Sequence, residues 1–139
     1  MTDASDRFTA FMDRIEQDRA LVQATRLDTD AWELELRVDG GRTQLAVVAL
    51  VDGEEEPQVA VFSFISPANP DFYEAALRTN ANLEYGRVAL VEHRDATWFA
   101  VVDTSPLDEL DTDELMHAID EVAASADALE AAFTGADDQ

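Results

Sequence analysis

The stretch of sequence that decides the fold is residues 43–51, TQLAVVALV. Apolar side chains occupy the odd positions from Leu45 to Val51 and also the even positions from Ala46 to Leu50. Because successive side chains of a strand point to opposite faces of a sheet, this strand is apolar on both faces. An antiparallel sheet built around it needs a cover on each face, and self-association as a two-fold dimer is the simplest second cover.

Strand patterns lie on both sides of this stretch. Residues 32–38 alternate apolar and charged side chains, and residues 39–41 (DGG) predict a tight hairpin turn into the central strand. A polar turn at 52–57 leads into a second strongly apolar run, and a break with two prolines ends it. The strands predicted from these patterns are 32–38, 43–51, 59–65, 88–92 and 97–102.

Three segments space their apolar residues as amphipathic helices do. Each begins at a residue that can cap a helix and ends where the apolar spacing stops. The helices predicted are about 5–23 with Ser5 as N-cap, about 71–84 with Asp71 as N-cap, and one from Asp111 or Thr112 to about Thr134, with Gly135 as its stop.

The predicted elements follow one another in the order α-β-β-β-α-β-β-α. Connections between them are short, and no internal repeat or long linker separates two parts of the chain. We therefore predict one domain over residues 1–139, with an ordered core from about 5 to 133. Its class is α+β, an antiparallel sheet with helices packed on it.

The charge of the chain is its most unusual property. All nine basic residues are Arg, Lys is absent, and 31 acidic residues bring the formal net charge to −22. At molar salt the Debye length is about 3 Å, so such a surface repels itself little. We interpret the composition as that of a halophile's salt-adapted cytoplasm. The same charge excludes a general binder of nucleic-acid phosphates and disfavours anionic membrane surfaces.

Two features that the sequence lacks restrict its chemistry and its expected cellular location. The sequence contains no Cys, which excludes disulfides, a thiolate nucleophile and Cys-based metal sites. Residues 1–6 (MTDASD) lack the basic and apolar regions of a signal peptide, and no run approaches the ~18 apolar residues that span a bilayer. We expect a cytoplasmic protein.

Motifs that carry chemistry are missing as well. The sequence has no G-x-S-x-G, no glycine-rich phosphate loop and no G-x-G-x-x-G, so we predict a non-enzymatic protein without cofactor or metal. One alternative stays open, a small-molecule- or divalent-metal-binding regulator or enzyme that uses the acidic region 103–114 with His117 behind it. Its carboxylates are Asp103, Asp108, Glu109, Asp111, Asp113 and Glu114.

Three smaller features have local interpretations. Asn80 and Asn82 precede residues 85–87 (YGR) and predict a hydrogen-bonded corner where a helix meets a strand. His93 lies in a predicted turn, where a surface histidine is ordinary. Trp98 is expected to pack in the core.

The segments 76–90 (ALRTNANLEYGRVAL), 98–102 (WFAVV) and 107–115 (LDELDTDEL) resemble the YbjN-like family. That family has the fold of type III secretion chaperones, whose order of elements is the one predicted above. The resemblance implies a dimeric α+β module that holds extended segments of other proteins, by strand addition or through apolar surface pockets. It carries no catalytic residues.

These observations favour a non-enzymatic, protein-binding module, chaperone-like or regulatory, that forms a homodimer and takes a protein or peptide partner. Its apolar residues on the sheet or on the second predicted helix are the candidate contacts. The candidates for partner binding or dimerisation are Phe62, Phe64, Phe72, Tyr73 and Leu77.

Overall fold

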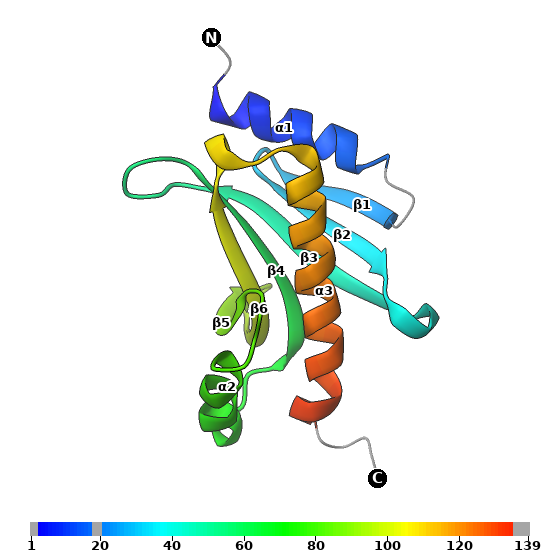
Figure 1. Ribbon diagram of the computed structural model, residues 1–139, viewed down its shortest axis with the longest axis vertical. Coiled ribbons are helices and arrows are strands. Elements are labelled where there is room, and N and C mark those ends of the chain that lie inside the picture. The colour runs from blue at the N-terminus through cyan, green and yellow to red at the C-terminus, as the bar shows by residue number, and fades with distance from the viewer. Residues whose placement is uncertain (1–2, 18–20, 135–139) are drawn as a thin grey trace.

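The structure is a computed structural model that describes residues 3–17 and 21–134 (Figure 1). Three α-helices and six strands form it, joined by short turns. The helices are α1 (Ala4–Ile15), α2 (Tyr73–Asn80) and α3 (Thr112–Thr134), and the strands are β1 (Leu21–Asp28), β2 (Ala31–Arg37), β3 (Thr43–Val51), β4 (Gln58–Pro67), β5 (Arg87–His93) and β6 (Ala96–Pro106).

All six strands belong to one antiparallel sheet with the order β1-β2-β3-β4-β6-β5. The first four strands form a meander, and the β5–β6 hairpin returns so that β6 pairs with β4 and β5 becomes an edge. The strand that is apolar on both faces, β3, lies inside the sheet as its sequence requires. The predicted α+β class, with helices packed on an antiparallel sheet, is confirmed.

The first predicted helix is wrong in its second half. The helix ends at Ile15, and Leu21–Asp28 is a strand, β1, that pairs with β2. The order of elements is therefore α-β-β-β-β-α-β-β-α. β1 is an edge strand, mostly exposed, and it mixes polar and apolar residues on both faces, so it lacks the alternation that marks a half-buried strand.

Two predicted N-caps are also corrected. The cap of α1 is Asp3, whose Oδ1 accepts the backbone N–H of Asp6 at 2.8 Å, while the hydroxyl of Ser5 donates to Asp30. A 3-10 turn at Pro70–Phe72 precedes α2, and Asn69 rather than Asp71 accepts the capping N–H. The α2 helix is shorter than predicted, because the Asn80 side chain turns to the sheet at its end. The predicted stop at Gly135 lies outside the described residues.

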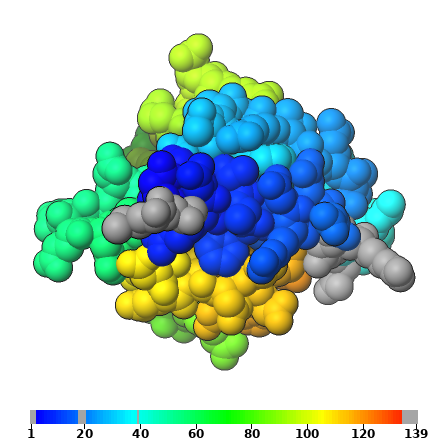
Figure 2. Space-filling view, turned by 90° about the horizontal axis from the view of Figure 1, so that it is seen from above, coloured from blue at the N-terminus to red at the C-terminus, as the bar shows by residue number. Residues whose placement is uncertain are grey.

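All three described helices lie on one face of the sheet. α3 crosses β3, β4 and β6, and α1 lies across one end, between β1 and the start of α3 in Figure 2. Phe8 of α1, Ala76 of α2 and Ile119 of α3 all join one core cluster with Leu34 and Val61 of the sheet. No helix among the described residues covers the opposite face, although β3 is apolar there too.

An ion pair ties the start of β3 to α3. Arg42 donates from Nε and an Nη to the two carboxylate oxygens of Asp127, at 3.1 and 2.6 Å. These hydrogen bonds are the main reason that the pKa of Asp127 lies below its ordinary value of 3.8. A carboxylate whose pKa is lowered by folding stabilises the fold above its unfolded-state pKa and loses that contribution as the pH falls through the folded value.

We therefore expect Arg42→Gln to lower the free energy of unfolding by about 1 kcal/mol at pH 7. The difference from wild type shrinks as the pH falls below the unfolded-state pKa of Asp127, because the unfolded chain then takes up a proton that the paired carboxylate of folded wild type resists. Urea unfolding at pH 7 and pH 3.5, at constant ionic strength, measures it. A difference that is independent of pH would mean that Arg42 acts through packing alone.

Candidate functional site

The face of the sheet that bears no described helix is called the open face here. Its register is continuous, since Glu33, Val47, Phe62, Val102 and Arg87 pair in one row across five strands. On β1 and β2 the open face includes Gln23, Thr25, Asp28, Ala31, Glu33, Glu35 and Arg37. On the other four strands it includes Thr43, Leu45, Val47, Ala49, Val51, Gln58, Ala60, Phe62, Phe64, Arg87, Ala89, Val91, His93, Trp98, Ala100, Val102 and Thr104.

Aromatic rings gather at its centre. The ring of Phe64 lies 5.7 Å from Phe62, 5.4 Å from Trp98 and 4.8 Å from His93, measured between centroids. Val47, the register partner of Phe62, and Ala100, the register partner of Phe64, are buried although no described helix lies over them. The rings and the curvature of the sheet therefore form a second apolar cluster on the open face, and Trp98 belongs to it rather than to the predicted core.

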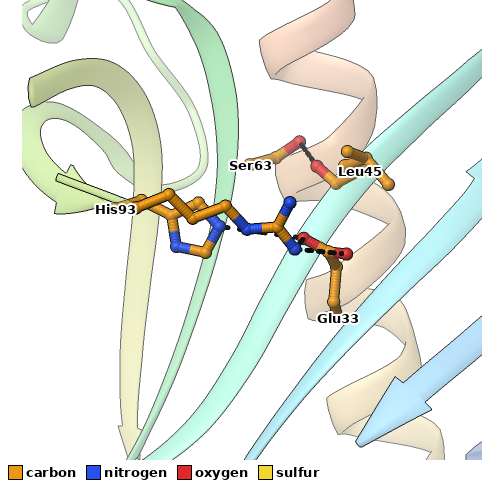
Figure 3. A network of polar contacts seen from close by, with 5 residues as sticks. Glu33, Leu45, Ser63 and His93 are labelled. Atoms are coloured by element: carbon orange, nitrogen blue, oxygen red, sulfur yellow. Dashed lines mark hydrogen bonds and ion pairs between the residues drawn. The ribbon is translucent and has the colours of Figure 1, made fainter. Parts of the chain in front are cut away.

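A charged bridge crosses this cluster. The guanidinium of Arg94 lies 3.3 Å from both carboxylate oxygens of Glu33, and His93 Nε2 lies 3.7 Å from the same carboxylate (Figure 3). The β5–β6 turn thus reaches over β3 and β4 to β2. Arg94 and Asp95 have φ of 52° and 65°, the left-handed conformation of a tight hairpin turn. His93, predicted as an ordinary surface residue, is instead held between Phe64 and Glu33.

A second apolar surface lies at the β5 edge. Leu77 of α2 is 71% exposed, Leu90 of β5 is 50% exposed and Tyr73 is 40% exposed. Tyr73 meets the ring of Phe99 edge-on at 5.9 Å, and Leu90 is the register partner of that same Phe99, so the exposed side chains are neighbours. Phe72 packs partly against the core. Tyr73, Leu77 and Leu90 are called the α2–β5 surface below.

The predicted corner between α2 and β5 is confirmed. Asn80 accepts the backbone N–H of Val88 at 2.6 Å and donates to its carbonyl oxygen at 3.2 Å. Gly86 turns the chain there with φ of 75°, and a Cβ would stand 2.9 Å from the carbonyl oxygen of Val102. The backbone N–H and C=O of Val88 therefore point away from β6 and are satisfied by Asn80. Because these groups alternate along an antiparallel strand, the N–H and C=O of Leu90 and of Glu92 also point away from β6.

Acidic residues of the region 103–114 make contacts that stabilise the fold. Asp111 accepts the backbone N–H of Glu114 at 2.8 Å, and Glu114 accepts that of Asp111 at 3.0 Å, a reciprocal cap at the start of α3. Asp108 pairs with Arg7 of α1 at 2.5 Å. Within residues 3–17 and 21–134, no three His or carboxylate side chains converge as metal ligands. The predicted alternative of a metal site gains no support.

A cavity of about 470 Å³ lies beside this region, lined by residues that include Tyr85, Glu114 and His117. Burial raises the pKa of the Tyr85 phenol, and the carboxylates of Asp103, Glu121 and Glu114 raise it further. Burial also raises the pKa of Asp103, against the opposing effect of Arg87. Tyr85 thus stays a neutral phenol, and its surroundings do not activate it as a base or nucleophile.

The five predicted contact residues form two separate groups. Phe62 and Phe64 lie on the open face, whereas Phe72, Tyr73 and Leu77 lie on or beside α2. The exposed members of the two surfaces that sequence reasoning missed are Leu45, Val51 and Leu90. Their strands were recognised, but strand alternation does not say which face the helices cover.

Residues 4–134, from the first residue of α1 to the last of α3, match YbjN, described as "Putative bacterial sensory transduction regulator". The chain belongs to the YbjN family. No curated protein matches it significantly.

The YbjN domain contains both apolar surfaces, because the match spans every described helix and strand. The family's description is compatible with a non-enzymatic regulatory or binding role. None of the described helices has the length and apolar content that crossing a membrane requires. The relation to type III secretion chaperones stays a prediction.

Proposed function

We propose that this YbjN protein is a non-enzymatic regulatory module that works as a homodimer and acts by holding an extended segment of another protein. The observation that carries the proposal is the α2–β5 surface. It combines the outer edge of a sheet with exposed apolar side chains, of which Leu77 is 71% exposed.

An extended segment fits this surface by adding a strand to β5. The outward backbone groups of Leu90 and Glu92 supply main-chain hydrogen bonds, and Tyr73 and Leu77 contact alternate apolar side chains of the segment. Asn80 already pairs with Val88, so the added strand ends before that residue. The corner thereby limits the length and register of the bound segment.

The charge around this surface indicates which charge the bound segment should carry. Asp71 and Glu74 flank the apolar side chains on the α2 side, and Glu92 lies on β5. Glu74 is paired with Arg78, but the chain as a whole carries −22. A segment with basic residues around an apolar centre is therefore the preferred ligand, and an acidic one is repelled.

Affinity capture from the host's own lysate at its native salt tests the proposal. Leu77→Lys preserves helix propensity and places a positive charge against a basic segment, so we expect at least about tenfold less of the captured partner. The matched control is Val22→Lys at the opposite edge of the sheet, where the side chain is 44% exposed. Equal recovery by wild type, Leu77→Lys and Val22→Lys contradicts the α2–β5 surface as the binding site.

A further inference from the structure

The sheet divides into two halves near the start of β3. In the part of the chain that the structure describes, pairing between β3 and β4 ends at Ala46 and Ser63. Both strands extend past that point, β3 to its first residue Thr43 and β4 to its last residue Pro67. There β3 stays paired with β2, whereas β4 stays paired with β6 through a bulge after Phe64. An opening therefore lies between the two central strands.

Polar side chains take the place of the ladder at this opening. Gln44 Nε2 donates to the hydroxyl of Ser63 at 3.0 Å and to the carbonyl oxygen of Phe64 at 2.7 Å. The Ser63 hydroxyl donates in turn to the carbonyl oxygen of Leu45 at 2.5 Å (Figure 3). Gln44 and Ser63 are both buried. Because buried polar groups are costly unless they are paired, these hydrogen bonds stabilise the opening as part of the fold.

A cavity of about 440 Å³ lies at the opening and is called the gap cavity here. Its lining includes Leu45 and Phe64 from the two diverging strands. His93 and Trp98 also line it, and their ring centroids lie 4.8 and 5.4 Å from that of Phe64. Aromatic walls and a volume between about 300 and 1,000 Å³ are typical of sites for small organic molecules.

The β5–β6 turn crosses the opening from one half of the sheet to the other. Its Arg94 lies 3.3 Å from both carboxylate oxygens of Glu33 on β2, and both side chains line the gap cavity. Arg94 and Asp95 have φ of 52° and 65°, in the region that favours glycine. Such backbone strain in residues other than glycine is concentrated at active sites and ligand clamps.

Two nitrogen atoms of the lining residues are buried with no hydrogen-bond partner among the described residues. They are Trp98 Nε1 and His93 Nε2, and the second lies 3.7 Å from the Glu33 carboxylate, beyond hydrogen-bond distance. An indole N–H can only donate, and a buried donor without an acceptor is costly. The gap cavity therefore favours a ligand that brings an acceptor to Trp98.

The charges around the gap cavity favour a neutral ligand. An anion would be repelled by Glu33 and Glu130, which both line the cavity. An organic ammonium would be repelled by Arg94, and it carries donors only, so it would leave the Trp98 N–H unpaired. A neutral carbonyl group supplies the acceptor without either repulsion.

We infer that the gap cavity binds a small neutral aromatic amide or lactam, a planar ring with a carbonyl group next to an N–H. The ring packs against Phe64, the carbonyl oxygen accepts the Trp98 N–H, and the ligand's N–H donates to the Glu33 carboxylate. This site goes beyond the proposed function, since no residue of the α2–β5 surface lines the cavity.

NMR titration of the wild-type chain with 2-naphthamide tests the inference. The chain has two tryptophans, so two indole N–H signals are expected, and Trp98→Phe assigns them. We expect the Trp98 signal to move and to saturate. Trp32 is an internal control, because its Nε1 is also buried without a described partner but its side chain lies in the core beneath the helices. Its signal should stay in place.

Affinities measured by equilibrium dialysis test the contacts. Trp98→Phe keeps an aromatic ring but removes the N–H, and should weaken 2-naphthamide binding about tenfold. Trp32→Phe makes the same change in the core and should leave the affinity unchanged. The anion 2-naphthoate and the cation 2-naphthylmethylammonium have the same rings and should bind at least about tenfold more weakly than the amide. Circular dichroism checks that both variants fold.

Three results overturn the inference. They are a Trp98 signal that does not move up to the solubility limit of 2-naphthamide, two indole signals that move alike, and equal or tighter binding of either charged probe. Failure here is distinct from failure of the proposed function. Leu77→Lys, which should reduce partner capture, should leave the affinity for 2-naphthamide unchanged, because Leu77 does not line the gap cavity.

Discussion

Replacing Phe99 with alanine is expected to lower the free energy of unfolding by about 3–5 kcal/mol. Phe99 of β6 is 2% exposed and meets two helices at once. Its ring stands edge-on to Tyr73 at the start of α2, at 5.9 Å, and to Phe133 near the end of α3, at 5.2 Å. The truncation therefore leaves a cavity and removes two ring contacts, and urea unfolding at high salt measures the loss.

The matched control is Leu90→Ala, at the register partner of Phe99 on the edge strand. Because Leu90 is 50% exposed, its truncation should cost below about 1 kcal/mol. Phe99→Ala should also loosen α2, which faster amide exchange in residues 73–80 would reveal. A loss no larger than that of Leu90→Ala would show that Phe99 does not join the two helices energetically.

Dialysis from molar to about 50 mM KCl is expected to lower the melting temperature by at least about 10 °C. The chain has 31 acidic side chains and nine arginines, so 31 − 9 = 22 carboxylates have no basic residue to offset them. Lower salt lengthens the Debye length from about 3 Å to above 10 Å, and repulsion among these carboxylates then destabilises the folded state.

Differential scanning calorimetry at several KCl concentrations checks this expectation, with NaCl and KBr at matched ionic strength as controls. Screening depends on ionic strength, so the three salts should give similar curves at low concentration. This expectation follows from the interpretation that the chain is adapted to a salt-rich cytoplasm. A melting temperature that stays constant on dilution would refute that interpretation.

Local patterns were sufficient for most of the elements. The turn at residues 39–41 is where its glycines predict it, with φ of 80° at Gly40, and α3 begins at a reciprocal cap between Asp111 and Glu114. Asn80 forms the expected corner with β5. Each of these depends on residues close together in the chain, so their chemistry is visible in the sequence.

β1 shows where such patterns fail. Its segment begins with apolar residues that extend the apparent stripe of α1, and its exposed edge position removes the alternation that burial would impose. What makes it a strand is its backbone pairing with β2. Pairing is a property of the neighbouring strand, so residues 21–28 taken alone favour the wrong element.

The sequence predicted that the protein has apolar contact surfaces, but not where these surfaces lie on the fold. The apolar composition of β3 by itself determined that the sheet has two apolar faces. Only the tertiary structure decided that all three described helices share one face, and that Phe62 and Leu77 belong to different surfaces. It also joined Glu33 to Arg94, 61 residues apart. Side-chain periodicity specifies which faces are apolar, whereas twist and packing across the whole sheet decide what lies over each face.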